Sequence, residues 1–319
     1  MKVKEPWAYV NGEFVPESKA TISVFDRSIR SGDHVYEVER TFHGKLFKLD
    51  EHMIRLYQGL KYCRIDPGFS PDEISRVSRE LIERNLPFLG PYEEWKICQV
   101  VTRGLVDPIY DMKGGQGQGD KATVIMFCLR LNPGSWAKYY LQGRKARLSS
   151  IRRIPPECLS PKTKIANKMN LVLASLEVQE LDPEAIAVVL DVEGNLNCIA
   201  PGGNLLFVSK GRIHMPNRRN TINGMSQATV LELADQLGIP WIEGDFIPFD
   251  LYNADEAFVT ETRGCMLPVV SLNGVPIGSG RPGPMFAQLI SAWSELTGMD
   301  LVEQSLRALS PGERQAIQV

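Results

Sequence analysis

Residues 35–60, "VYEVERTFHGKLFKLDEHMIRLYQGL", predict a strand, a tight turn and a helix in direct succession. His43-Gly44 marks the turn, because glycine adopts positive φ angles without steric cost. Beyond it, Leu56 and Leu60 belong to an apolar series at helical spacing, and Asp50 is a candidate N-cap. The stretch therefore favours an antiparallel hairpin followed by an amphipathic helix.

The flanking sequence extends this pattern in both directions. "WAYVNGEFVP", residues 7–16, predicts a hairpin that turns at Asn11-Gly12. "SPDEISRVSRELIERN", residues 70–85, predicts a second helix capped by Ser70, and "EWKICQVVTRG" and "ATVIMFCLRL" read as buried strands. The first part of the chain is thus expected to combine strands and helices.

The second half also alternates element types, and "LNPGSW" marks a boundary near residue 133. We expect a mixed α/β (α+β) protein with a small N-terminal α/β domain over 1–132, a linker over 133–136 and a large C-terminal α/β domain over 137–319. The elements expected in the second half are strands near 146–151, 185–191, 204–209 and 256–260, and helices near 165–180, 227–237 and 284–297, the last being the final helix.

Composition excludes several function classes. The 319 residues are 43% apolar and carry a formal charge of −2 without a basic stripe, so nucleic acid is not an expected partner. The N-terminus lacks an apolar signal core and no run reaches about 18 apolar residues, which predicts a cytoplasmic protein with no membrane partner. Six cysteines without a C-x-x-C pair and four scattered histidines predict reduced thiols and no metal site.

Lys164 is the first candidate for chemistry. Ile165, Met169, Val172 and Leu176 recur at helical spacing, which places this lysine at the mouth of the expected helix rather than on its exposed side. A partly desolvated lysine can act as an amine nucleophile or a proton shuttle, whereas a solvated surface lysine is the ordinary alternative.

Three other signals point to an anion. Ser226 and the backbone N–H groups near Met225 stand at the expected start of a helix, Thr262 follows a strand in a small polar turn, and Arg55 lies within the first helix. Each has an ordinary structural interpretation as a cap, a turn or a surface residue. If one ligand explains the amine and the phosphate clamp together, a phosphorylated aldehyde is needed, and pyridoxal phosphate fits.

The blocks that carry these residues resemble the branched-chain, D-amino-acid and R-selective amine aminotransferases, the fold-type IV pyridoxal phosphate enzymes. The blocks include "FDRSIRSGDHVYEVERTFHGKLFKLDEHMIRLYQGL", "VTRG", "KIANKMNLVLASLEVQE", "NGMSQATVLELADQLGI" and "LYNADEAFVTETRGCMLPVVSLNG", in that order. The resemblance implies two α/β domains with pyridoxal 5'-phosphate in the cleft between them, and a homodimer.

The resemblance assigns roles by position. The family's Schiff-base lysine falls on Lys164, which stands three residues before Asn167, and not on its neighbours Lys162 and Lys168. The phosphate arginine of the H-x-x-R-L segment falls on Arg55. The phosphate donors at the helix start fall on Met225 and Ser226, and the later threonine falls on Thr262.

The sequence departs from the family in "NLNCIAPGGN", residues 195–204. The family's glutamate beside the pyridine nitrogen belongs to an E-G-x-x-x-N run, and the corresponding place here reads Asn197, Cys198, Ile199. Taken alone, Cys198 could be a catalytic thiol, a metal ligand or a small spacer; beside the family it becomes, with Asn197, a candidate cofactor contact. A thiol or an amide supports a protonated ring less well than a carboxylate does.

The second departure concerns the substrate carboxylate. D-amino-acid members carry an Arg-x-His trap where this chain has Pro108, Ile109 and Tyr110, which leaves Tyr36, Arg103 and Tyr110 as candidate substrate contacts. The resemblance implies an aminotransferase that moves an amino group between an amine or amino acid and a 2-oxo acid through a Lys164 aldimine. The alternatives are a lyase of the aminodeoxychorismate-lyase type and a cofactor-binding homologue with altered activity.

Overall fold

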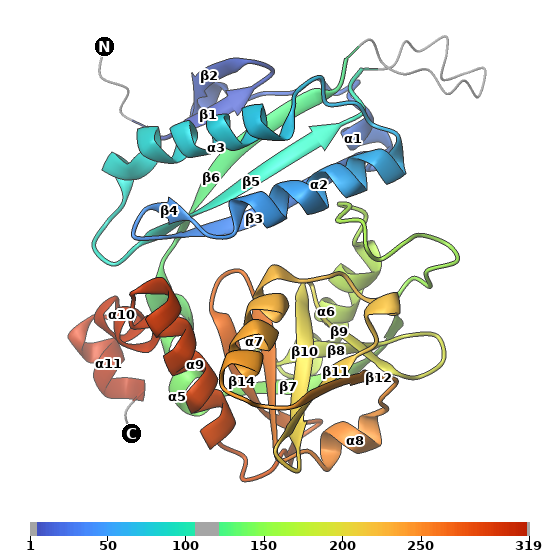
Figure 1. Cartoon of the computed structure of the whole chain (residues 1–319), viewed down its shortest axis with the longest axis vertical. Helices are drawn as coiled ribbons and strands as arrows, with labels where there is room; N and C mark the ends of the chain where they lie inside the picture. Colours follow the sequence, from blue (N-terminus) through green and yellow to red (C-terminus); the bar gives the residue numbers. More distant parts are fainter. Residues whose placement is uncertain (1–4, 106–120, 318–319) are drawn as a thin grey trace. The chain divides into compact units, whose positions relative to one another are not determined.

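The computed structural model describes residues 5–105 and 121–317. Contacts between Cα atoms divide the chain into two compact units (Figure 1). Unit 1 comprises Met1–Leu131 together with Thr163–Asn167, and unit 2 comprises Asn132–Lys162 together with Lys168–Val319. The short segment that contains Lys164 therefore belongs with the N-terminal elements, although it is remote from them in sequence.

Unit 1 is built on an antiparallel sheet of six strands in the order β2-β1-β6-β5-β3-β4. The long central strands are β3, β5 and β6, with the short strands β1 and β2 at one edge and the short strand β4 at the other. The strands are β1 (Trp7–Val10), β2 (Glu13–Pro16), β3 (His34–Phe42), β4 (Lys45–Leu46), β5 (Glu94–Thr102) and β6 (Thr123–Leu131).

Local sequence explains the turns of unit 1. The two expected hairpins are confirmed, with positive φ at Asn11 and Gly12 and at His43 and Gly44. The expected helices are α2 (Leu49–Cys63) and α3 (Pro71–Asn85). Ser70 caps α3 in a capping box with Glu73, as predicted for a serine at this place.

One capping prediction is wrong. Asp50 lies inside the first turn of α2, and the N-cap is Lys48 in a left-handed conformation. Asp50 still suits its position, because a carboxylate in the first turn complements the helix dipole.

Helices α2 and α3 contact the strands of unit 1 and bury a core against the sheet (Figure 1). The smaller helix α1 (Arg27–Ser31) precedes β3, and short 3-10 turns cover Glu17–Lys19 and Leu86–Phe88. The core is apolar and centred on Trp95, and it includes Leu56, Leu60, Ile74, Leu81, Ile97 and Met126.

Unit 2 contains a nine-stranded mixed sheet in which β9 also pairs with β10. This pairing closes β10, β13, β14, β7, β8 and β9 into a ring, with β11 and β12 continuing outward from β10. The strands are β7 (Arg144–Arg152), β8 (Ile186–Leu190), β9 (Leu196–Ala200), β10 (Gly203–Ser209), β11 (Arg212–Pro216), β12 (Trp241–Gly244), β13 (Glu256–Glu261), β14 (Cys265–Leu272) and β15 (Val275–Pro276).

The helices of unit 2 are interspersed with its strands along the chain. The predicted helix near 284–297 is present but is not the last one, because two short helices follow it. The helices are α5 (Ala137–Gln142), α6 (Met169–Leu181), α7 (Met225–Gln236), α8 (Pro248–Tyr252), α9 (Pro284–Thr297), α10 (Leu301–Arg307) and α11 (Pro311–Ile317). Short 3-10 turns cover Pro133–Trp136, where Pro133 and Trp136 are buried, and Arg218–Asn220.

Helix α6 corrects the sequence interpretation in two ways. It begins at Met169, so Lys164 precedes it by more than a turn rather than standing at its mouth. The buried face consists of Leu171, Ala174 and Val178, whereas the expected inward stripe is exposed, 66% at Met169 and 51% at Leu176. Apolar residues occupy both sides of this helix, so their spacing did not identify the core face.

Within residues 5–105 and 121–317, no helix has the length and apolar character to cross a membrane. No group of three or more potential metal ligands gathers in this part of the chain. No disulfide joins the six cysteines, all of which are described.

Candidate active site

Lys164 is fixed by the edge of unit 1 rather than by a helix. Its backbone carbonyl accepts a hydrogen bond of 3.0 Å from the N–H of Tyr36, and Ile165 forms an isolated bridge with Val35. Its Nζ lies 4.8 Å from the centre of the Tyr36 ring, a cation–π distance. The lysine is partly buried. Two predicted site residues, Lys164 and Tyr36, are therefore brought together.

The two rival lysines lie elsewhere. Lys162 is exposed and donates from Nζ to Oδ1 of Asn223 at 2.8 Å, and Lys168 is the residue before the first turn of α6. Both belong to unit 2. Burial lowers the pKa of Lys162, although Glu243 opposes the shift.

Arg55 is buried in α2 and forms a two-point ion pair with Glu37 of β3. Its Nε donates to Oε1 at 2.6 Å and its Nη2 donates to Oε2 at 2.7 Å. His52, one helical turn earlier, lies 2.8 Å from the same carboxylate through Nδ1. Sequence reasoning identified Arg55 but missed its two partners, although the H-x-x-R spacing places His52 and Arg55 on one helix face.

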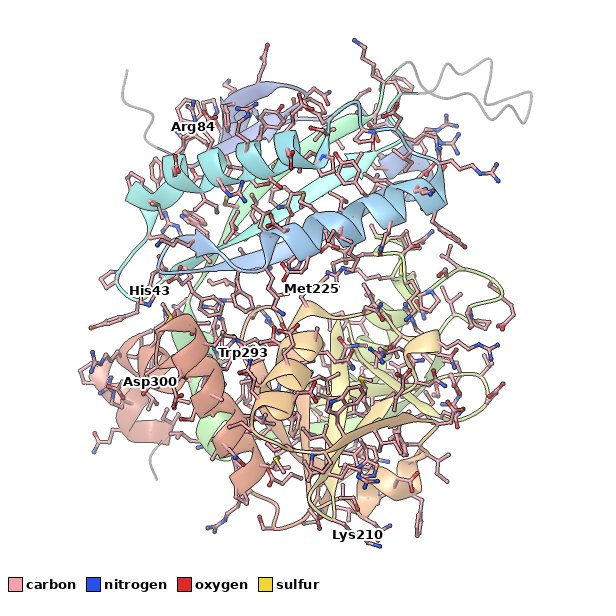
Figure 2. The ribbon with its side chains drawn as sticks, viewed as in Figure 1. His43, Arg84, Lys210, Met225, Trp293 and Asp300 are labelled. Atoms are coloured by element: carbon pink, nitrogen blue, oxygen red, sulfur yellow. The ribbon has the colours of Figure 1, made fainter. Side chains whose placement is uncertain are left out.

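In unit 2 the first turn of α7 is tied to the end of β13. Figure 2 shows Met225 where α7 begins, and the Ser226 hydroxyl donates to the Glu261 carbonyl at 3.0 Å. Thr262 follows Glu261 directly in a turn. The structure thus brings Met225, Ser226 and Thr262 to one place. The Ser226 hydroxyl hydrogen is used by Glu261, so its backbone N–H is the group left to serve an anion, as helix-start N–H groups do.

Two asparagines hold the segment that leads into α7. Nδ2 of Asn197 in β9 donates to the Asn220 carbonyl at 2.9 Å, and Nδ2 of Asn204 in β10 donates to the Ile222 carbonyl at 3.1 Å. A Cβ on Gly224, the N-cap of α7, would lie 2.1 Å from Oδ1 of Asn204. Glycine is therefore required there for α7 to begin this close to β10.

Several neutral side chains of unit 2 carry buried atoms with unused hydrogen-bonding capacity. Oδ1 of Asn197, Oγ1 of Thr221 and Oγ1 of Thr260 have no partner among the described residues, and each residue is at most 2% exposed. Buried polar atoms are rarely left without a partner in proteins. A polar ligand that reached any of these atoms would complete its hydrogen bonds.

Cys198 points away from Asn197. It packs in an apolar cluster with Leu171, Ala174 and Val178 of α6, and burial raises the pKa of its thiol to about 11. Side chains alternate along a strand, so Asn197 and Ile199 share the opposite face of β9. Ile199 also stands where the E-G-x-x-x-N spacing counted back from Asn204 puts the glutamate. That face presents an amide and a sec-butyl group, neither of which is charged.

Of the two remaining residues predicted to contact the substrate, Arg103 is described by the structure and Tyr110 is not. Arg103 donates from Nε and Nη2 to both oxygens of Asp33, at 2.7 and 3.1 Å, and also to the carbonyls of Cys63 and Arg64. Two of these bonds tie the end of β5 to Asp33, just before β3, and the other two tie it to the end of α2. Tyr110 and the loop beside it lie outside the described residues.

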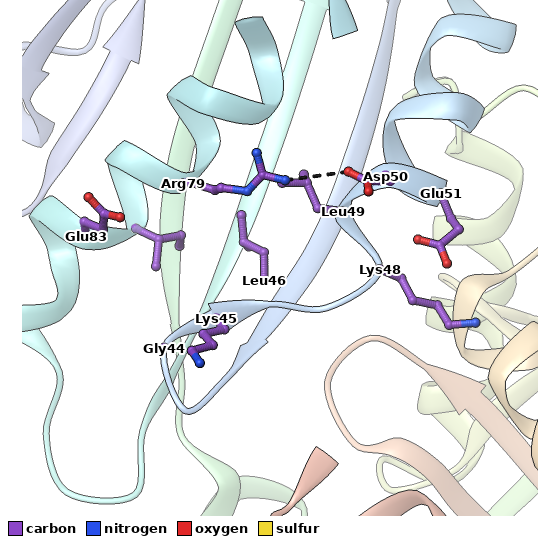
Figure 3. Close-up of a pocket in the computed structure, with 10 residues that line it drawn as sticks. Gly44, Lys45, Leu46, Lys48, Leu49, Asp50, Glu51, Arg79 and Glu83 are labelled. Atoms are coloured by element: carbon purple, nitrogen blue, oxygen red, sulfur yellow. Dashed lines mark ion pairs between the residues drawn. The ribbon is translucent and has the colours of Figure 1, made fainter. Parts of the chain in front are cut away.

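Unit 1 also has a groove of about 490 Å³ beside the β3–β4 hairpin (Figure 3). Its charged lining includes an ion pair between Arg79 and Asp50, 3.6 Å apart. The lining residues are Gly44, Lys45, Leu46, Lys48, Leu49, Asp50, Glu51, Arg79, Ile82 and Glu83. None of them is a predicted site residue.

Comparison with known proteins decides the family. Residues 34–272 match the model of amino-transferase class IV. The chain is a class IV aminotransferase. It is 30% identical over 289 residues to a putative branched-chain-amino-acid aminotransferase of Methanocaldococcus jannaschii, covering 90% of this chain and 95% of the relative. It is 29% identical to the D-alanine aminotransferase of Bacillus licheniformis, covering 86% and 91% of the two chains.

Solved structures agree with this class IV assignment. The branched-chain amino acid aminotransferase from Escherichia coli matches with a TM-score of 0.80 and 27% identity, covering 92% of this chain and 95% of that one. Another solved branched-chain amino acid aminotransferase, bound to pyridoxamine 5'-phosphate, matches with a TM-score of 0.81 and 26% identity, covering 93% and 96% of the two chains. The fold-type IV prediction is therefore confirmed, and the protein is a pyridoxal 5'-phosphate-dependent aminotransferase. The comparisons support transamination and not the lyase alternative.

Proposed function

We propose that Lys164 is the amine that carries the cofactor, and that Arg55, Met225, Ser226 and Thr262 hold its phosphate. The observation that carries this proposal is the position of Lys164. Its backbone is bound to β3 and its Nζ lies against Tyr36, whereas Lys162 and Lys168 belong to unit 2. Arg55 grips the next residue of the same strand, Glu37.

The residues present fit pyridoxal phosphate. Arg55 supplies a guanidinium, and the first turn of α7 supplies backbone N–H groups, which together suit a phosphate dianion. The unused Oδ1 of Asn197 supports a contact with the cofactor ring. Cys198 is not proposed as a cofactor contact, because its side chain packs against α6. When bound, the cofactor supplies an electron sink for the bond between Cα and its hydrogen in the donor.

Lys164 then performs two tasks. With the cofactor bound, its amine would hold the cofactor, and after displacement by a donor amine the free side chain would be the base that moves the proton between the donor Cα and carbon C4′. The Tyr36 ring fixes the direction of this side chain, because the ring face attracts the ammonium at 4.8 Å. One base that serves both carbons produces the proton shift of transamination.

The proposed reaction moves an amino group from an amine or amino acid to a 2-oxo acid. The class IV relatives are named for amino acid donors, branched-chain and D-alanine. Tyr36 is the described candidate for contact with the donor, since it is partly buried beside Lys164. Arg103 is not proposed as a donor contact, because its guanidinium already makes four hydrogen bonds.

Absorbance of the purified protein with pyridoxal phosphate tests this function. Titration with amines and with D- and L-amino acids should bleach the band of the bound cofactor for at least one donor, with one oxo product formed per cofactor. A protein that binds the cofactor but whose band no donor bleaches would contradict the proposed reaction. A protein that binds none would contradict the site.

We also propose that the enzyme is a cytoplasmic homodimer. For the location, six cysteines without a disulfide suit a reducing compartment. For the dimer, α6 carries exposed apolar side chains that a second subunit would cover, namely Met169, Val172, Leu173 and Leu176. Sedimentation should give twice the 35.7 kDa chain mass. Leu176→Asp should shift the protein to the monomer while Glu180→Gln on the same helix does not; a monomeric wild type would contradict the dimer.

A further inference from the structure

The pair of Arg55 and Glu37 has a geometry that fixes the plane of the guanidinium. Two parallel N–H···O bonds join Nε and Nη2 to the two carboxylate oxygens, so rotation about the last bonds of the arginine is blocked. The carboxylate uses two of the five N–H groups that a guanidinium carries. Glu37 is fully buried and Arg55 is 8% exposed.

His52 supports the carboxylate from a third direction. An ionised carboxylate only accepts hydrogen bonds, so Nδ1 of His52 carries the hydrogen and donates it to Oε2 of Glu37. Burial lowers the pKa of His52 despite the favourable contact with Glu37, and the charges of Arg55 and Lys164 act in the same direction as burial. The ring therefore serves as a neutral donor.

From these contacts we propose that Glu37, held by His52, is a positioning residue that fixes the Arg55 guanidinium for the cofactor phosphate. The inference rests on the proposed function, which places the phosphate on Arg55. Neither Glu37 nor His52 touches the phosphate in this account. Both act through the arginine.

The alternative role of Glu37 is that of a simple counter-ion, and the two roles predict opposite results. Burial alone would raise the pKa of Glu37, but the charge and hydrogen bonds of Arg55 and the bond from His52 lower it, so the carboxylate is charged. A charged carboxylate beside the arginine also repels a phosphate dianion. Its removal strengthens phosphate binding if Glu37 only balances charge, and weakens it if Glu37 positions the guanidinium.

The experiment compares two ligands that differ only in the phosphate. Kd is measured by absorbance for pyridoxal phosphate and for pyridoxal. The ratio of the Kd of pyridoxal to the Kd of pyridoxal phosphate reports how strongly the protein binds the phosphate group. Glu37→Gln should lower the preference for the phosphorylated ligand about tenfold, as expected for the loss of a charge-assisted two-point contact, with the Kd of pyridoxal unchanged. A purely structural defect would weaken both ligands alike.

Glu39→Gln is the matched control. Glu39 lies two residues along β3 and is fully buried, but it contacts Gln99 rather than Arg55, with 2.5 Å between Oε1 and Nε2. This control should leave the ratio of Kd values within about twofold of the wild type. A change in the ratio as large as that of Glu37→Gln would overturn the proposal, because any glutamine in this strand would then suffice.

Two variants of His52 decide the matter if Glu37→Gln does not fold. His52→Phe removes the donor and keeps the charge of Glu37, so the ratio should fall about threefold. His52→Asn places an amide N–H near the position of Nδ1 and should restore it. Equal ratios for the two variants would overturn the proposal.

The outcomes separate this inference from the proposed function. If Arg55→Lys lowers the ratio while Glu37→Gln leaves it unchanged or raises it, the positioning role is wrong and the phosphate assignment stands. If Arg55→Lys leaves the ratio of the wild type unchanged, the phosphate assignment itself is wrong and the inference falls with it.

Discussion

The two units supply site candidates of opposite character. In unit 1 the phosphate candidate Arg55 is charged and already paired with Glu37, which also accepts a hydrogen bond from His52. In unit 2 they are neutral, and atoms of Asn197 and Thr260 are buried without partners. Charge that is buried before a ligand arrives needs a partner within its own unit, whereas neutral atoms can be left for the ligand at lower cost.

Removal of the Lys164 amine from unit 1 should have the largest effect on activity. Lys164→Ala should lower transamination by at least about 10³-fold, because it removes the base that also carries the cofactor. Steady-state assays with a donor found by titration check this. Lys162→Ala and Lys168→Ala are the matched controls and should keep most of the activity; a comparable loss in either would assign the amine to unit 2.

The second prediction concerns a carboxyl group in unit 1 that lacks a charged partner. Burial raises the pKa of Glu39 to about 8; the nearby Glu37 charge adds to this, while the Gln99 hydrogen bond and the charges of Arg55 and Arg79 oppose it. The native state therefore favours the protonated acid, and its contribution to the free energy of unfolding falls as the pH rises from 4.5 to about 8.

Denaturant unfolding at several pH values measures that contribution. The wild type should lose about 3 to 5 kcal/mol across this range and level off above it. Glu39→Gln is uncharged throughout and should remove most of the slope. A variant with the same pH dependence as the wild type would show that Glu39 is not the group that titrates.

The third prediction concerns neighbouring residues of β9 in unit 2. Asn197→Ala should lower turnover about tenfold and shift the absorbance of the bound cofactor, because it removes a neutral contact to the ring. Cys198→Ala should leave turnover unchanged and cost about 1 kcal/mol of stability, since its thiol only fills a core. The reverse result would show that the opposite face of β9 meets the cofactor.

Sequence predicted the parts of the fold that short-range chemistry determines. The turns at Asn11-Gly12 and His43-Gly44 and the capping box at Ser70 depend on residues within a few positions of one another. The core face of α6 could not be chosen, because its residues are apolar on both sides. The two helices after Thr297 are short and lacked a clear apolar period.

Long-range pairing explains what the sequence could not provide about the candidate site. Family motifs named Lys164 and Arg55, but the bond from Tyr36 to Lys164 joins residues far apart in the chain. Glu37 alternates with apolar residues on β3, which is typical of a solvent-facing side chain, and only the packing of α2 shows that it is buried. Likewise, the "VTRG" motif does not indicate that Arg103 binds Asp33, which lies 70 residues earlier in the chain.

Everything proposed for this site depends on the amine of Lys164, held against β3, carrying the cofactor. Borohydride reduction of the protein with pyridoxal phosphate, followed by peptide mass spectrometry, tests it most directly, because reduction makes the bond to the modified lysine permanent. The account predicts a phosphopyridoxyl group on Lys164 and none on Lys162 or Lys168. A group on either of those residues, or a protein left unmodified, would contradict it.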